Sequence, residues 1–193
     1  AGECACVSLN GANRLGSNSL TELLVFGDRA GTAAAQFAHD HPQINSRSLE
    51  AQAADEQQRI SRTYINRSDG TESIATIRRE MNEAMESGVG IFRNKGSLTA
   101  SCDKLAQLRE RFQHIALDDH TLSFNTELTA ALELEYMLDV AESVAHSALH
   151  RTESRGSHQR LDHPQRDDEQ FLKHSLAYRQ ESAAPRIAYK DVT

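Results

Sequence analysis

Hydrophobic residues recur at helical spacing through the middle of the chain, from residue 74 to residue 149. Three segments carry apolar positions three and four residues apart, a spacing that is typical of amphipathic helices. Three apolar faces of this kind predict an antiparallel bundle in which the faces turn toward one another. In chain order, the faces consist of Ile74, Ile77, Met81, Ala84 and Met85; of Leu98, Cys102, Leu105, Leu108, Phe112 and Ile115; and of Leu134, Met137, Leu138, Ala141, Val144, Ala145, Ala148 and Leu149.

The residues that flank these segments indicate where the helices begin and end. Asp69 and Glu72 have the spacing of a capping box, which would start the first helix, and Gly88 can end it. Ser97 is expected to open the second helix. The third and longest helix is expected to run from about Thr126 to Thr152.

Two further helices are predicted before the bundle. Residues 49–64 form a polar, weakly periodic segment, and an apolar run that begins at Leu20 predicts a helix to about Ala38. One of residues 17–19 can cap that earlier helix, and His41-Pro42 ends it. Its faces carry small residues suited to close packing on a sheet: Gly27, Ala30, Gly31, Ala33 and Ala34.

Short extended segments lie at the two ends of the chain. Residues 4–7 are predicted to close a sheet, and residues 175–179 and 186–189 are predicted to form a hairpin. The expected fold class is therefore α+β and mostly α. It combines the closing strand and helix of a nucleotide-type α/β domain, an antiparallel helical bundle and a C-terminal hairpin. This organisation divides the chain into three segments: residues 1–41, 42–156 and 157–193.

The composition suits part of a larger protein better than a self-sufficient domain. Aromatic residues make up 5% of the 193 residues, Trp is absent, and the mean hydropathy is −0.59. The net charge of −7 argues against a nucleic-acid surface. No run approaches the roughly 18 apolar residues of a membrane helix, so the chain is expected to be soluble. Since the sequence starts inside a motif without an initiator Met, we expect a piece of a longer protein.

Neither the cysteines nor the histidines predict a metal site. Cys4, Cys6 and Cys102 are an odd number without repeating spacing, which points to a reducing compartment. His146 and His150 lie four residues apart, but positions on a helix surface explain that spacing better than a metal site does.

Chemistry is concentrated in residues 11–20, Gly-Ala-Asn-Arg-Leu-Gly-Ser-Asn-Ser-Leu. Arg14 can grip a carboxylate with two parallel hydrogen bonds, because its guanidinium is planar. Gly11 and Gly16 let the backbone approach a ligand closely. The amides that open the next helix suit an electron-rich group. From the residues alone, an ordinary capped helix after a turn explains the segment equally well.

Residues 1–27 resemble the last flavin-binding segment of the flavoprotein subunit of fumarate reductase and succinate dehydrogenase. In that family, an Ala-Gly-Glu turn is followed by Gly-Ala-Asn-Arg-Leu-Gly-x-Asn-Ser-Leu. The family usually has His where this chain has Asn10, a departure that bears on local hydrogen bonding only. Similar segments continue through the chain: residues 88–93, 125–128, 132–134, 153–158, 166–168 and 171–174.

The resemblance implies FAD as cofactor and assigns roles to five residues. Arg14 is the implied catalytic residue, which holds a carboxylate of fumarate or succinate. Glu3 is implied to contact FAD, as is Asn13, and the backbone of Ser19 and Leu20 to lie against the pyrimidine edge of the flavin. The family's dinucleotide turn, flavin-linking histidine and proton-donating arginine are not found in this sequence, so the isolated chain is expected to be inactive.

The resemblance also implies partners, namely an iron–sulphur subunit and membrane-anchor subunits, which would hold the protein at the cytoplasmic face of the cell membrane. Ser17 favours fumarate reductase over succinate dehydrogenase, in which a second glycine is expected there. Succinate dehydrogenase remains an alternative, and so does a non-catalytic helical interaction module. L-aspartate oxidase shares the arginine turn, but residues 166–168 and 171–174 argue against it.

A second group of charges follows the longest predicted helix. Arg155, His158 and Arg160 cluster in the sequence with Asp162 and Asp167. Charges that alternate in sign near a helix end more often form a salt-bridged cluster than a catalytic site, so we favour the structural interpretation.

Overall fold

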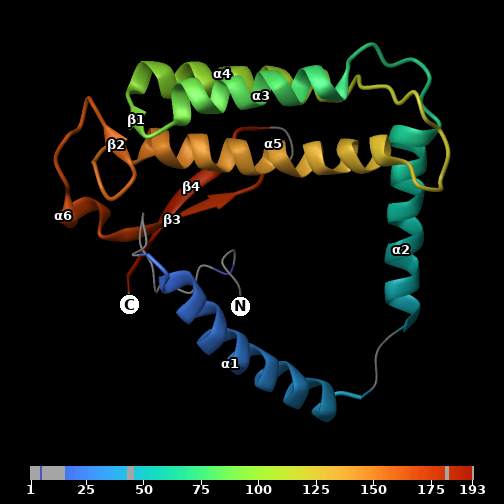
Figure 1. Ribbon diagram of the computed structural model, residues 1–193, viewed down its shortest axis with the longest axis horizontal. Coiled ribbons are helices and arrows are strands. Elements are labelled where there is room, and N and C mark those ends of the chain that lie inside the picture. The colour runs from blue at the N-terminus through green and yellow to red at the C-terminus, as the bar shows by residue number, and fades with distance from the viewer. Residues whose placement is uncertain (1–4, 6–15, 43–45, 181–182, 193) are drawn as a thin grey trace. The chain divides into compact units, whose positions relative to one another are not determined.

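The computed structural model describes residue 5 and residues 16–42, 46–180 and 183–192. The chain separates into two units, one ending at Ala54 and the other comprising Asp55–Val192 (Figure 1). The strand predicted at residues 4–7 lies, apart from residue 5, outside the described residues. The proposed division into three segments stays a prediction.

The first unit contains α1 (Asn18–Asp40), which confirms the helix predicted after the glycine-rich turn. Of the three residues that were predicted as possible caps, Ser17 occupies the N-cap position. Its φ of 64° is left-handed, and its side chain makes no capping hydrogen bond. At the other end, His41 N donates to Phe37 O. Gly27 and Gly31, expected to pack on a sheet, have open space around them.

The predicted polar helix is confirmed as α2 (Ser46–Ile60), which continues into the π-helical turn η2 (Ser61–Ile65). Tyr64 of this turn is buried, and its hydroxyl donates to Glu135 Oε2 at 2.8 Å. Its ring packs edge-on against Phe112 with the ring centroids 6.4 Å apart. One aromatic residue therefore attaches η2 to two helices of the bundle.

The bundle consists of α3 (Ile74–Val89), α4 (Lys95–Phe112) and α5 (Thr126–His150), which run side by side and antiparallel (Figure 1). The predicted bundle is thus confirmed. Its central side chains have almost no exposed surface, which is the principal source of stability in such a fold. The largest aliphatic side chains that are fully buried are those of Ile77, Leu98, Leu105, Leu108, Ile115, Leu134 and Leu138.

The predicted boundaries of α3 are wrong at both ends. Ser73, not Asp69, is the N-cap residue. The carboxylate of Glu72 binds Arg111 instead of closing a capping box, with Oε2 2.8 Å from Arg111 Nη2. Gly88 lies inside the helix, which ends at Val89. A Cβ at Gly88 would come within 2.0 Å of Ser101 Oγ on α4. The glycine allows α3 and α4 to approach closely.

The other two helices differ from the prediction at single residues. Asn94 is the N-cap of α4, where Ser97 was expected: Asn94 Oδ1 accepts from Ser97 N at 2.9 Å. Ser97 Oγ in turn accepts from Asn94 N at 3.4 Å, so the two residues form a capping box. On α5, Val144 is 41% exposed, although it was expected on the buried face. Helix α5 ends at His150, earlier than predicted.

Short strands complete the fold. The predicted hairpin is confirmed as β3 (Lys173–Tyr178) paired antiparallel with β4 (Arg186–Asp191). Helix α5 lies between this hairpin and the pair α3–α4 (Figure 1). The sequence did not predict β1 (Phe92–Arg93), which pairs in parallel with β2 (Gln159–Arg160). A single turn of helix, α6 (Asp168–Phe171), precedes the hairpin.

The burial of Leu138 allows a test of the bundle core. Leu138 is 1% exposed, so Leu138→Ala should lower the free energy of unfolding by about 2–5 kcal/mol, as truncation of a buried Leu does. Val144→Ala on the same helix is the matched control and should cost under about 1 kcal/mol. Urea unfolding of both variants measures the two effects. If Val144→Ala were the more destabilised, the assignment of Leu138 to the buried face of α5 would be contradicted.

Candidate functional site

Two regions carry side chains or backbone groups with functional potential: the start of α1 and the polar groups beyond the end of α5. Among the residues predicted to contact flavin or substrate, Glu3, Asn13 and Arg14 lie outside the described residues. Ser19 and Leu20 are described and lie in the first turn of α1, with Ser19 half-buried and Leu20 63% exposed.

The first turn of α1 has the features of a site for an electron-rich group. It contains no acidic residue, and the Ser17 side chain does not cap its amides. Leu20 N donates to Ser17 O at 3.1 Å. Among the described residues, no atom lies within 4 Å of where a Cβ on Gly16 would be. The positive end of the helix dipole, without an acidic residue in its first turn, suits an electron-rich group.

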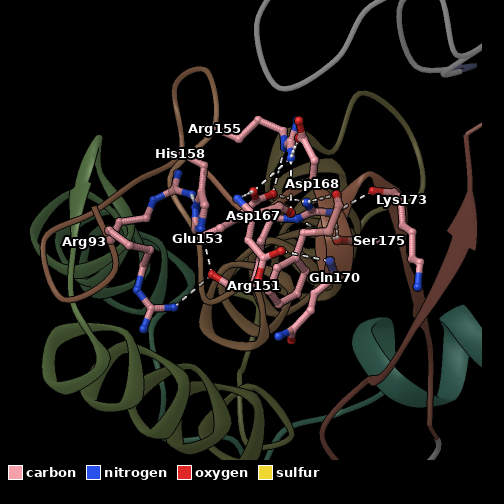
Figure 2. A network of polar contacts seen from close by, with 12 residues as sticks. Arg93, Arg151, Glu153, Arg155, His158, Asp167, Asp168, Gln170, Lys173 and Ser175 are labelled. Atoms are coloured by element: carbon pink, nitrogen blue, oxygen red, sulfur yellow. Dashed lines mark hydrogen bonds and ion pairs between the residues drawn. The ribbon is translucent and has the colours of Figure 1, made fainter. Parts of the chain in front are cut away.

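The second region centres on Glu153, whose side chain is fully buried where the chain leaves α5 (Figure 2). Its Oε1 accepts hydrogen bonds from Arg151 Nη1 at 2.5 Å and from Arg155 Nε at 2.8 Å. Its Oε2 accepts from Arg155 Nη2 and from Asp167 N, both at 2.9 Å. Burial by itself would raise the pKa of this carboxyl, but the hydrogen bonds outweigh burial and hold the pKa below its ordinary value.

Arg151 connects Glu153 to the C-terminal part of the chain. Its Nη1 donates to Phe171 O at 2.8 Å, and its Nη2 donates to Lys173 O at 2.6 Å and to Ser175 Oγ at 3.2 Å. Its guanidinium also lies over the Phe171 ring, 5.3 Å from the centroid. One cation thus fixes both α6 and the first residues of β3 against the end of α5.

Arg155 forms a second bridge, from Glu153 to α6. Its Nη2 donates to Asp168 Oδ1 at 2.6 Å, and its pKa is raised by the hydrogen bonds to Glu153 and Asp168. Asp168 also pairs with Arg166 at 2.8 Å. The sequence suggested that Asp167 takes part in the ion pairs, but its Oδ1 instead caps α6 by accepting from Gln170 N.

Arg160 and Asp162 connect the end of α5 with the start of α4. Arg160 is 1% exposed and binds Asp162 with two parallel hydrogen bonds of 2.8 and 2.9 Å. Its Nη1 donates to the carbonyl oxygens that end α5, those of Ala148, Leu149 and Arg151. Asp162 Oδ2 accepts from Lys95 N, in the first turn of α4. The pair therefore satisfies orphan groups at both helix ends.

Arg93 Nη1 also lies 2.7 Å from His158 Nδ1, and His158 Nε2 lies 3.0 Å from the carbonyl oxygen of Arg151. These contacts define what we call the C-terminal network: Arg93, Arg151, Glu153, Arg155, His158, Arg160, Asp162 and Asp168. Throughout the part of the chain that the structure describes, every buried side-chain polar atom has a hydrogen-bond partner. A network whose buried polar atoms are all hydrogen-bonded suits a structural role better than catalysis, in agreement with the interpretation favoured from the sequence. Arg151 and Glu153 were not singled out in advance, since a buried carboxylate has no signature in sequence apart from neighbouring arginines.

Other candidate chemistry is limited in the described residues. They contain no group of three metal-binding side chains, and none of their helices is long and apolar enough to cross a membrane. His150 Nδ1 contacts the carbonyl of His146, one turn earlier on α5. Burial raises the pKa of the Cys102 thiol to about 11, so this cysteine stays protonated near neutral pH.

Comparison with known proteins gives consistent matches along the chain. The family model described as fumarate reductase flavoprotein C-term matches residues 78–193. The fumarate reductase flavoprotein subunit of Mycobacterium tuberculosis is 51% identical over all of this chain, and the succinate dehydrogenase flavoprotein subunit of Rickettsia bellii is 38% identical. The chain spans about a third of the length of these relatives, 34% and 32% respectively.

The fold is similar to that of solved relatives as well. A structure of Escherichia coli quinol fumarate reductase matches 99% of this chain with a TM-score of 0.92 and 49% identity, and the chain covers 33% of that protein chain. A structure of Mycobacterium smegmatis Sdh1 in complex with UQ1 matches 98% of the chain with a TM-score of 0.82 and 31% identity.

Proposed function

This chain belongs to the fumarate reductase flavoprotein C-terminal family, and from that membership we propose that it forms part of a flavoprotein subunit that interconverts fumarate and succinate. The observation that carries the proposal is 51% identity to a fumarate reductase flavoprotein subunit over the whole chain. Because the relatives are about three times as long, the activity belongs to the longer protein.

In the proposed reaction, this chain contributes one side of the flavin and substrate site. Bound FAD would supply the hydride chemistry. Glu3 and Asn13 would hold the cofactor through polar contacts, and the backbone of Ser19 and Leu20 would contact the flavin. The positive end of the α1 dipole, with no acidic residue in the first turn, supports this assignment, since it favours an electron-rich group.

Arg14 has the central role toward the substrate. Reduction of fumarate adds a hydride to one alkene carbon and a proton to the other, and negative charge builds on a carboxylate during the first event. The guanidinium of Arg14 would hold that carboxylate with two hydrogen bonds and stabilise the developing charge.

The proposed partners are those of the relatives' complexes: an iron–sulphur subunit that exchanges electrons with the flavin, and membrane-anchor subunits. These would hold the protein at the cytoplasmic face of the cell membrane. We propose fumarate reduction as the physiological direction, because identity to fumarate reductase subunits reaches 51% against 38% for a succinate dehydrogenase subunit. Ser17 supports the same direction.

The proposal can be tested on the full-length protein. We expect the purified protein to show flavin absorbance and to oxidise a reduced dye in a fumarate-dependent manner, faster than it oxidises succinate. Heat-denatured protein is the control. A full-length protein with neither flavin nor turnover would contradict the proposal and favour a helical interaction module.

A further inference from the structure

His158 is only 5% exposed and lies between Arg93 and Arg151 (Figure 2). Its Nδ1 is 2.7 Å from Arg93 Nη1, and its Nε2 is 3.0 Å from the carbonyl oxygen of Arg151. A guanidinium can only donate and a carbonyl can only accept. These two partners therefore require a neutral imidazole with its proton on Nε2.

The charged groups that face this ring are all cations. Arg93 approaches from β1, Arg160 from β2 and Arg151 from the end of α5. The nearby carboxylates of Glu153 and Asp162 are bound by Arg151 and Arg160. A protonated ring would add a positive charge to three others and leave the Arg93 donor without its acceptor.

His158 lies directly before β2, where hydrogen bonds join β2 to β1. Gln159 N donates to Ile91 O at 3.3 Å, and Leu161 N donates to Arg93 O at 2.8 Å. Arg93 Nε also donates to Val89 O at 3.1 Å, at the end of α3. The bond between Arg93 and His158 thus links the ends of α3 and α5 across a ladder of two residues per strand, beside the bond from Lys95 N to Asp162 Oδ2.

We propose that His158 is an acid-sensitive joint: protonation of its ring releases Arg93 and opens the β1–β2 ladder, while the apolar core of the bundle stays folded. The bundle core is unaffected because its central side chains carry no titrating group that changes charge between pH 5 and 8. The joint is a property of the fold and does not depend on the direction of the proposed reaction.

The expected pH window follows from the direction of the pKa shift. Burial, followed by the charges of Arg93, Arg160 and Arg151, lowers the pKa of His158 in the closed form, despite the bond to the Arg151 carbonyl. When the joint is open, the pKa returns to about 6.5. The closed form is therefore fully stable above about pH 6.5, and the opening constant rises about tenfold per pH unit below it, until the closed-form pKa is reached.

Amide hydrogen exchange on the full chain, corrected for intrinsic rates, measures this opening. Between pH 7.5 and pH 5.5, we expect the opening constants of the Gln159 and Leu161 amides to rise about tenfold, and at both pH values to lie well above those of Leu105 and Leu108 in α4. Opening constants at residues 159 and 161 that do not change with pH would overturn the proposal. Opening constants of Leu105 and Leu108 equal to those of residues 159 and 161 would overturn it too, because the whole bundle would then be opening.

Two variants separate His158 from the other histidines. His158→Gln can still accept from Arg93 and donate to Arg151, but it does not titrate, so the pH dependence should disappear. His146→Gln is the control on α5 and should keep it. The assignment would be overturned if the pH dependence of opening persisted in His158→Gln or disappeared in His146→Gln. Should His158→Gln fail to fold, nitrogen NMR of the unaltered protein decides: a ring protonated on Nε2 and titrating below pH 6 supports the joint, and titration at 6.5 or above refutes it.

Discussion

Replacing Arg14 with Ala in the full-length protein should lower kcat/KM for fumarate about 10²–10³-fold or more, comparable to the loss of one donor to a developing oxyanion. The variant loses charge-assisted hydrogen bonds worth roughly 1.5–3 kcal/mol each. Arg14→Lys should recover little of the loss, since an ammonium group cannot reproduce two parallel hydrogen bonds. The measurement is fumarate turnover at saturating and limiting substrate, with the flavin content of each variant determined.

Arg29→Ala is the matched control for this experiment. Arg29 lies on α1, with its guanidinium 5.5 Å from the centroid of the Phe26 ring, and has no assigned part in the reaction. Its variant should keep both flavin and turnover. Near-normal turnover in Arg14→Ala or Arg14→Lys would remove Arg14 from the active site and, with it, the main support for the substrate assignment.

Glu153→Gln should lower the free energy of unfolding by about 3–5 kcal/mol, because it removes one partner from a buried charge network. The substitution keeps the volume of the side chain, so the loss reports charge and hydrogen bonding more than packing. Arg151 and Arg155 would both lose their anionic partner. Urea unfolding at pH 7 measures the effect.

The control for Glu153→Gln is Glu83→Gln, which removes an exposed carboxylate 3.8 Å from Arg79 and should cost under about 0.5 kcal/mol. The pH dependence provides a second check. Since folding depresses the pKa of Glu153, its contribution is present above the unfolded value of about 4.3 and is lost as pH falls through the folded pKa. Equal effects of the two substitutions would show that the buried charge does not stabilise the fold.

The bundle was predictable because burial leaves a periodic pattern. Leu98, Leu105 and Leu108 are each 0% exposed, as their spacing indicated. Helix ends were less predictable, because a capping pattern competes with tertiary contacts. Glu72 matched a capping box, but its carboxylate binds Arg111 and its backbone pairs with Ile115.

The candidate sites were also predictable from the sequence only in part. The ladder of Phe92–Arg93 with Gln159–Arg160 has no periodic signal, because strands of two residues are too short for alternation to appear. Glu153 and Arg160 resemble surface residues in sequence, and only the three-dimensional pairing of their charges shows why they are buried. Arg14 was found through a motif, and its role stays a prediction.

The C-terminal network joins residues that are far apart in the chain, which has a consequence for folding kinetics. Arg93 and His158 are 65 positions apart, and Lys95 and Asp162 are 67 apart, whereas Ser101 contacts Ala84 across only 17. Closing a longer loop costs more chain entropy, so the α3–α4 hairpin has the shorter path to its native contacts. We therefore expect the network to assemble after the transition state, so that its stabilisation slows unfolding and leaves the folding rate nearly unchanged.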